Sequence, residues 1–157
     1  MAPGTPGRIF VGNGLQFEGY TGGGTKQIVD GMLASGDVGH FDDAGRLFID
    51  GRDDEMIVSG GENVVPGEVE DALEDHPDIV EAAVVGVDDP EFGQRLRSFV
   101  VTRPGASLSP GEVKDYVAQR LARFKVPRDV IFVDALPRNP SGKVLKRLLD
   151  HSSRRTR

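Results

Sequence analysis

A lysine near the C-terminus lies in the stretch LPRNPSGKVLKR, residues 136–147. The turn of Pro140, Ser141 and Gly142 places Lys143 at the start of what the pattern predicts as the last helix. The first turn of a helix carries partial positive charge, so a cation there loses a few tenths of a kcal/mol to about 1 kcal/mol. A local rule broken without visible compensation favours a functional role for this lysine. The alternative is a solvated lysine after a turn.

An aspartate and an arginine each follow a glycine, in the stretches SGDVG (35–39) and DGRDD (50–54). The carboxylate of Asp37 can accept hydrogen bonds from two neighbouring hydroxyls, as acidic residues do when they hold a ribose diol. The guanidinium of Arg52 adds a forked donor. The alternative for each residue is a turn position or a surface ion pair.

Two further stretches are rich in glycine. In TGGGTK (21–26) the glycines would let backbone N–H groups converge on a phosphate, but the spacing G-x-x-x-x-G-K-[ST] is absent. A surface loop is therefore expected there. The stretch SGGENVVPGEVE (59–70) predicts a glycine turn that leads into an acidic helix, in which Glu68 suits the first turn.

The first fifty residues predict short strands and turns rather than helices. Asp43, Ala44 and Gly45 are expected to form the turn of a hairpin. This part has little apolar mass, so we expect it to be a piece of a larger sheet or barrel. The expected strands cover residues 8–11, 15–20, 37–42 and 46–50.

After residue 53 the pattern changes to strands alternating with amphipathic helices. One helix is expected to begin at Pro66, and a second at Pro110 behind a capping box of Ser109 and Glu112. The expected strands cover residues 79–87, 95–102 and 130–134, and the last helix has an apolar stripe of Val144, Leu145, Leu148 and Leu149. The sequence thus predicts an α+β fold, in which a short sheet with helices on one side occupies 54–157 and a β-rich piece occupies 1–53.

Composition excludes several classes of protein. The absence of cysteine excludes disulfides, thiolate catalysis and zinc–thiolate sites, and no metal-ligand set is predicted. A net charge of -6 argues against a nucleic-acid binder. The longest apolar stretch, residues 82–87, is too short to span a bilayer, and the first ten residues lack the pattern of a signal peptide. A cytoplasmic location is expected.

Taken together and in order, these stretches resemble the C-terminal part of the adenylate-forming superfamily, which includes acyl-CoA synthetases, adenylation domains of peptide synthetases and luciferases. The resemblance covers nearly the whole chain, including IFVGNGLQFEGY at residues 9–20. It implies an acid–thiol ligase that forms an acyl-AMP from ATP and then a thioester with CoA. The longest matching stretches are 35–70, 81–89 and 124–147.

The resemblance implies a role for each candidate residue. Asp37 would hold the ribose hydroxyls of ATP and of the acyl-adenylate, with help from Arg52. Asp54 would be the hinge between the large domain, of which residues 1–53 are the end, and a small mobile lid, residues 54–157. Lys143 would reach into the active site during adenylation. The loop that meets the pantetheine arm would consist of Gly60, Gly61 and Glu62.

This sequence also departs from the family. The phosphate loop and the Y-G-x-T-E-like segment that helps bind ATP and magnesium are absent, so Mg²⁺ is expected only in a full-length enzyme with ligands outside this chain. Serine replaces threonine in the T-G-D motif, and Glu55 follows the hinge where aspartate is usual. We therefore expect a fragment that is inactive without the large domain.

Two alternatives remain at the level of sequence. The fragment could come from an adenylation domain that loads a carrier protein, or it could be a non-catalytic α+β interaction module. The pocket that selects the acid would lie in the large domain, so fatty-acid metabolism is one role among several, with aryl and short-chain acids also open.

Overall fold

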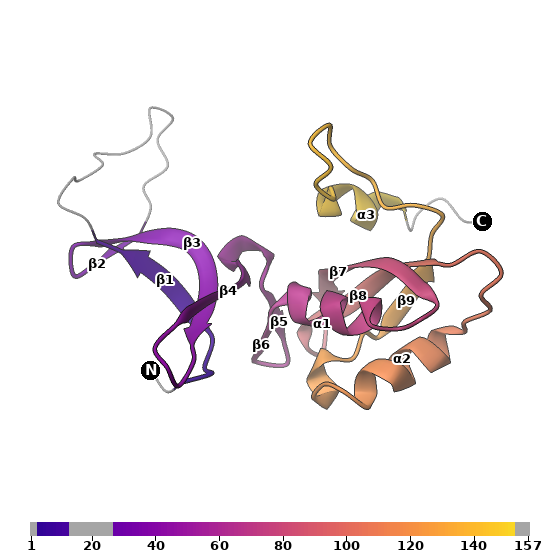
Figure 1. Cartoon of the computed structure of the whole chain (residues 1–157), viewed down its shortest axis with the longest axis horizontal. Helices are drawn as coiled ribbons and strands as arrows, with labels where there is room; N and C mark the ends of the chain where they lie inside the picture. The colour runs from indigo at the N-terminus through magenta and orange to yellow at the C-terminus, as the bar shows by residue number, and fades with distance from the viewer. Residues whose placement is uncertain (1–2, 13–26, 153–157) are drawn as a thin grey trace. The chain divides into compact units, whose positions relative to one another are not determined.

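The computed structural model describes residues 3–12 and 27–152 (Figure 1). The strand expected at 15–20 and the loop expected at 21–26 lie outside the described residues. The chain divides into two compact units, Met1–Asp54 and Glu55–Arg157, which we call the first and the second unit. Their assignment to the end of a large domain and to a lid stays a prediction.

The first unit is an antiparallel sheet built around one long strand. β3 (Met32–Phe41) pairs with β1 (Gly7–Val11) along one edge, and with β2 (Ile28–Val29) and β4 (Leu47–Arg52) along the other. The expected hairpin turn between β3 and β4 is confirmed: Asp42 Oδ1 accepts hydrogen bonds from the N–H groups of Ala44 and Arg46 at 3.0 and 2.8 Å.

Few apolar side chains of the first unit are covered. Among its described residues, Val38 is the one buried apolar side chain. Phe41 and Ile49 are more than half exposed, at 52% and 61%. The sheet therefore lacks a core of its own within the described residues, as a piece of a larger sheet would.

The second unit contains a five-stranded sheet. Its central strand pairs with one antiparallel neighbour along its whole length, and with a parallel and an antiparallel neighbour on the opposite edge. Two very short strands at the end of the sheet were not expected from the sequence, because a strand of three residues shows no clear alternation. The strands are β5 (Ile57–Ser59), β6 (Glu62–Val64), β7 (Ile79–Asp89), β8 (Gly93–Thr102) and β9 (Asp129–Phe132), with β8 at the centre.

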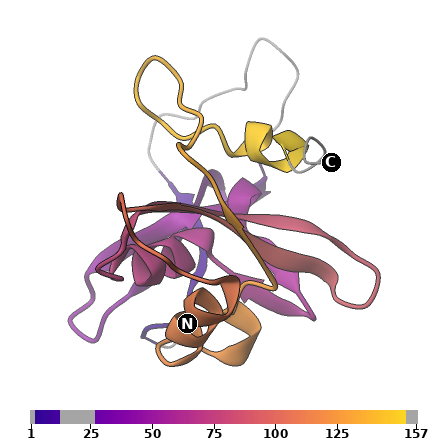
Figure 2. The same ribbon diagram turned by 90° about the vertical axis from the view of Figure 1, so that its right-hand side faces the viewer.

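Helices cover both faces of this sheet (Figures 1 and 2). α1 (Pro66–Glu74) and α2 (Pro110–Ala118) pack on the face that includes Val84, whereas α3 (Lys146–Ser152) packs on the opposite face. The α+β class is confirmed, but the expectation of helices on one side is wrong for α3. The reason lies in β7, where successive residues 82–85 are all apolar, so both faces of the strand need covering. No helix among the described residues is long and apolar enough to cross a bilayer.

The free edge of β7 is capped by carboxylates from α1. Glu74 Oε1 accepts from the N–H of Ala82 at 3.1 Å, and Glu70 Oε1 accepts from the N–H of Val84 at 2.7 Å. These contacts satisfy backbone donors that an edge strand would otherwise present to solvent or to another chain. They also fix α1 relative to the sheet.

Candidate functional site

Strand pairing brings Asp37 and Arg52 together in the first unit. The two residues are directly opposite each other on β3 and β4. Arg52 Nη1 donates to Asp37 Oδ1 at 3.2 Å, and Arg52 Nε donates to Asp54 Oδ1 at 3.3 Å. Three of the residues selected from the sequence therefore form one charged cluster, in which the guanidinium lies between two carboxylates.

A glycine makes room for this cluster. Gly36 has a φ of +90°, and a Cβ placed there would lie 3.1 Å from Arg52 Nη2. Any larger residue would be strained and would push against the guanidinium. Ser35 Oγ accepts from the N–H of Asp37 at 3.1 Å and donates to the carbonyl of Ile9 at 3.1 Å. The serine, glycine and aspartate at 35–37 thus each contribute to orienting the carboxylate.

The electrostatics of the cluster favour its charged form. The side-chain hydrogen bond and charge of Asp54, followed by the charge of Asp37, raise the pKa of Arg52. The side chain of Asp37 is 32% exposed, and its Oδ2 has no hydrogen bond to a described residue. The surface ion pair is therefore present, and one carboxylate oxygen can still accept from a ligand.

Gly60 and Gly61 form the turn of the β5–β6 hairpin in the second unit. Both have positive φ, 60° and 85°, which suits a two-residue hairpin turn. The N–H of Gly60 donates to the carbonyl of Phe92 at 2.9 Å. The turn borders a pocket of about 890 Å³ that Glu62, Phe92 and Arg128 also line. The predicted loop is thus a two-residue hairpin turn beside a pocket.

Asp89 supports this turn indirectly, through Phe92. Its Oδ1 accepts from the N–H groups of Glu91 and Phe92 at 2.9 and 3.0 Å, and its Oδ2 pairs with Arg95 at 3.3 Å. The N–H of Phe92, then that of Glu91, and then Arg95 lower the pKa of the Asp89 carboxyl. The sequence alone did not single out Asp89. Its contact with the Gly60 turn through Phe92 is non-local, and no local pattern predicts it.

Lys143 closes a tight hairpin turn and does not belong to a helix. Asn139 Oδ1 accepts from the N–H of Lys143 at 2.8 Å and from Ser141 Oγ at 2.8 Å, and Gly142 has a φ of +86°. The backbone stays extended beyond the turn, where Val144 forms a bridge with Arg138.

The prediction that Lys143 stands at the start of the last helix is therefore wrong. α3 begins three residues later, at Lys146, so Lys143 does not oppose the helix dipole, and a misplaced charge is no argument for a functional role of this lysine. Sequence reasoning missed the side chain of Asn139, which holds the turn closed. The side chain of Lys143 is exposed, and its ammonium has no hydrogen bond or ion pair to a described residue.

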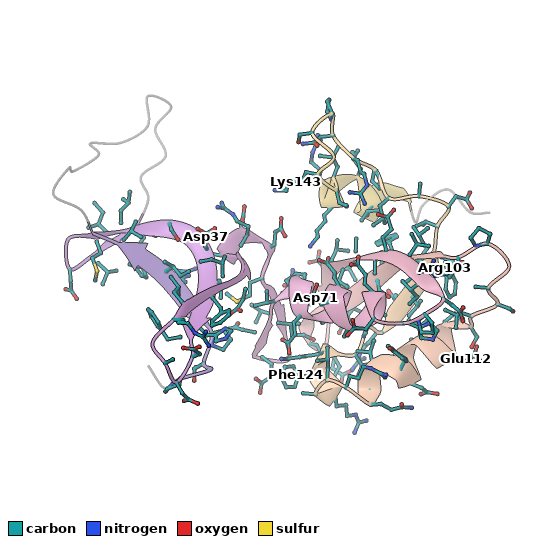
Figure 3. The ribbon with its side chains drawn as sticks, viewed as in Figure 1. Asp37, Asp71, Arg103, Glu112, Phe124 and Lys143 are labelled. Carbon is teal, nitrogen blue, oxygen red and sulfur yellow. The ribbon has the colours of Figure 1, made fainter. Side chains whose placement is uncertain are left out.

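The candidate residues are divided between the two units. The first unit holds Asp37, Arg52 and Asp54. In the second unit, Lys143 lies on the α3 side of the sheet, whereas Phe124 of the pocket lies on the α2 side (Figure 3). One unit therefore presents two different candidate surfaces. Within residues 3–12 and 27–152, no group of three or more carboxylate or imidazole side chains could hold a metal ion.

Comparison with known proteins identifies the family. Residues 68–143 match the AMP-binding enzyme C-terminal domain, so this part of the chain has the C-terminal domain of adenylate-forming enzymes. The resemblance seen in the sequence is confirmed, and the chain corresponds to a C-terminal portion of such enzymes.

Relatives match the chain over only part of their length. A methyl-dioxo-octahydroindenyl-propanoyl:CoA ligase of Rhodococcus jostii is 51% identical over 76% of this chain, which covers 23% of that protein. The fatty acid–acyl-carrier-protein ligase ScoC of Streptomyces coeruleorubidus is 40% identical over 95% of this chain, which covers 29% of ScoC. The crystal structure of ATP-bound MatB from Rhodopseudomonas palustris matches with a TM-score of 0.84 and 35% identity, over 99% of this chain and 32% of MatB.

Proposed function

We propose that the chain supplies the lid, and the strands that precede it, of an ATP-dependent acyl-CoA synthetase. Such an enzyme activates a carboxylic acid as an acyl-AMP and then transfers the acyl group to the thiol of CoA. The observation that carries the proposal is Lys143, an ammonium free of described partners on a turn that its neighbours hold closed. The sequence similarity to CoA and carrier-protein ligases supplies the reaction class.

Lys143 would act in the first half-reaction. When the carboxylate attacks the α-phosphorus of ATP and pyrophosphate leaves, negative charge gathers on oxygens that repel one another. A compact ammonium placed beside them stabilises this charge more in the transition state than in the ground state. Because no carboxylate among the described residues pairs with Lys143, its charge is available to the phosphates.

Asp37 and Arg52 would hold the ribose. The free Oδ2 of Asp37 can accept from the two hydroxyls, while Arg52 fixes the other oxygen and so the orientation of the carboxylate. The described residues thus fit the sugar of ATP, but they offer no ligand set for the Mg²⁺ that the proposal assigns to the full-length enzyme. We place the metal ligands in the large domain, on the segments whose motifs this sequence lacks.

The turn of Gly60 and Gly61 would act in the second half-reaction. A turn without side chains lets a narrow pantetheine arm pass close to the backbone. The adjoining pocket combines aromatic and cationic side chains, Phe124 and Arg128 among them. Asp54 would be the hinge about which the lid moves to exchange the Lys143 surface for this turn between the two steps.

The alternative acceptor is a carrier protein, which the similarity to ScoC favours. Both acceptors present a pantetheine thiol, so the turn of Gly60 and Gly61 fits either one. An assay that supplies free CoA or holo carrier protein to the same enzyme distinguishes them. The pocket that selects the acid, whether fatty, aryl or short-chain, would lie in the large domain. The chain alone should be inactive.

A chimeric enzyme tests the proposal. The chain would replace the matching C-terminal portion of the Rhodococcus jostii CoA ligase, and pyrophosphate exchange and thioester formation would be measured with that ligase's own acid. We expect both activities to be restored relative to the truncated ligase. A chimera no more active than the truncated ligase would contradict the proposal and favour a non-catalytic module.

The prediction for Lys143 uses the same chimera. Lys143→Ala should reduce acyl-AMP formation by about 10² to 10³, the effect of removing a single electrostatic donor. Thioester formation from supplied acyl-AMP should change little, because the lid would then present the Gly60 turn. Equal losses in the two half-reactions would instead make Lys143 a structural residue.

A further inference from the structure

The turn that carries Lys143 has little apolar anchorage. Leu136 before it and Leu149 after it are buried against the sheet, and Val144 packs partly against the same cluster. Residues 140–143 are all exposed. The position of the Lys143 backbone therefore depends on polar contacts between these apolar anchors.

Arg138 supplies the first such contact. Its Nη1 donates to the carbonyl of Gly142 at 2.7 Å, and its Nη2 pairs with the carboxylate of Glu81 on β7. The two arms of one planar guanidinium thus join the residue before Lys143 to the sheet. A lysine could not make this forked connection, because its ammonium is a single point of charge.

Lys146, the first residue of α3, supplies the second contact. Its Nζ lies 2.8 Å from Glu70 Oε1 on α1 and 3.3 Å from Glu55 Oε2. The same Glu70 oxygen accepts from the N–H of Val84 on β7. Lys146 therefore connects the segment after Lys143 to α1, to the free edge of β7 and to the residue that follows Asp54.

We propose that Arg138 and Lys146 are positioning residues that hold Lys143 in place for adenylation; this inference rests on the role proposed above for Lys143. Arg138 fixes the turn from the side of β7, and Lys146 fixes the chain three residues beyond it. The contact of Lys146 with Glu55 sets the turn relative to the point where the lid leaves Asp54. A displacement of about 1 Å at a reacting group can cost about 10²-fold in rate.

The activity test compares Arg138→Ala and Lys146→Ala with matched controls in the chimera. Arg103→Ala removes an exposed arginine that donates to the carbonyl of Pro77, and Lys125→Ala removes a lysine paired with Glu68 on α1. We expect the two test variants to slow acyl-AMP formation by about 10- to 100-fold. Thioester formation from supplied acyl-AMP should stay within about twofold, and the controls should leave acyl-AMP formation unchanged.

Conservative variants of Lys146 and Arg138 distinguish the effect of side-chain geometry from the effect of side-chain charge. Lys146→Arg keeps a cation that can reach Glu70 and Glu55, so it should recover most of the adenylation rate lost in Lys146→Ala. Arg138→Lys should recover a smaller share of the adenylation rate lost in Arg138→Ala, because an ammonium cannot bridge Gly142 and Glu81 at once.

Hydrogen exchange on the chain itself gives a readout independent of activity. Backbone amides of residues 142–145 should exchange faster in Arg138→Ala and Lys146→Ala, while those of β7 and β8 keep their protection. Loss of protection throughout the sheet would make the two residues general folding residues and would overturn the inference.

Failure of the inference is distinguishable from failure of the proposed function. If Lys143→Ala slows adenylation but Arg138→Ala and Lys146→Ala do not, the inference is wrong and the proposed function stands. If Lys143→Ala leaves adenylation unchanged, the proposed role of Lys143 fails, and the positioning roles fail with it.

Discussion

At the scale of single residues, the charged groups of this chain differ in how many hydrogen bonds and ion pairs they form with neighbouring residues. Arg52 lies between two carboxylates, and Asp89 accepts from two backbone N–H groups and an arginine. Lys143 has no such partner among the described residues. A group that already has strong partners orients its surroundings, whereas a group without them keeps its charge for a ligand. This difference agrees with the role proposed for Lys143 and with the support that Asp89 gives to a turn.

The stability of Lys143→Ala should differ sharply from that of Asn139→Ala. Removing the exposed ammonium of Lys143 should change the free energy of unfolding by less than about 0.5 kcal/mol. Truncating Asn139 removes the acceptor for the N–H of Lys143 and for Ser141 Oγ, so a loss of about 1–2 kcal/mol is expected. Urea denaturation of the chain measures both. A stabilised Lys143→Ala would indicate an unfavourable contact of the ammonium, such as the helix-dipole contact that the structure does not contain.

Asp89 should make the stability of the second unit depend on pH. Its folded pKa is lowered, so its contribution is present above the unfolded pKa of about 4 and is lost as pH falls toward the folded pKa. Asp89→Asn should therefore lower the unfolding temperature at pH 7, and the difference from wild type should shrink below about pH 4. The exposed neighbour Asp88 gives the matched control, Asp88→Asn. A difference independent of pH would exclude the carboxylate charge as the cause.

Local chemistry identified Asp37, Arg52 and Lys143 as candidates, but the sequence did not reveal how each is held. The ion pair of Asp37 and Arg52 was one of the alternatives, and it forms because β3 and β4 pair in register. The context of Lys143 was mispredicted because the side chain of Asn139 and the bridge between Arg138 and Val144 hold this segment as a hairpin turn, and the helix begins only after it. The support that Asp89 gives to the Gly60 turn requires two hairpins to meet, which no local pattern encodes.

At the scale of elements, the elements marked by a local sequence signal were the ones predicted correctly. α2 begins at Pro110 behind the expected capping box, since Ser109 and Glu112 satisfy each other's backbone donors. The hairpin of β5 and β6 was missed because its strands are too short for a period to show. The carboxylates of α1 on the edge of β7 were missed because they connect segments that are distant in the sequence.

The capping box gives a prediction at this scale. Ser109→Ala removes the acceptor for the N–H of Glu112 and should destabilise the second unit by about 1 kcal/mol. Ser107→Ala changes an exposed serine just outside the helix and should have little effect. Chemical denaturation followed by circular dichroism measures both variants. Equal effects of the two substitutions would mean that the cap contributes nothing to stability.

At the scale of the whole molecule, the groups proposed for the two half-reactions are divided between the two units. Asp37 and Arg52, which are proposed to hold the ribose, belong to the first unit. In the second unit, Lys143 lies on the α3 side of the sheet, and Phe124, which lines the pocket beside the Gly60 turn, lies on the α2 side (Figure 3). A unit that presents two surfaces in succession can exclude water from a hydrolysable acyl-AMP and still admit the thiol afterwards. The sequence indicated this division through the change of pattern near Asp54, but not that helices would cover both faces of the second sheet.

The two units should differ in their resistance to local opening. Val38 is the one buried apolar side chain among the described residues of the first unit, whereas the second unit has two apolar clusters, one on each face of its sheet. Opening free energy follows buried apolar contact, so amides of β3 and β4 should exchange faster than those of β7 and β8. Hydrogen exchange with mass spectrometry on the chain measures this directly. If residues 1–53 are the end of a large domain, as proposed, that domain would cover the exposed apolar residues of the first sheet in the chimera. Exchange in β3 and β4 should then slow while exchange in β7 and β8 stays unchanged. Equal protection of the two sheets in the isolated chain would mean that the first unit has a core of its own and is not the end of a larger domain.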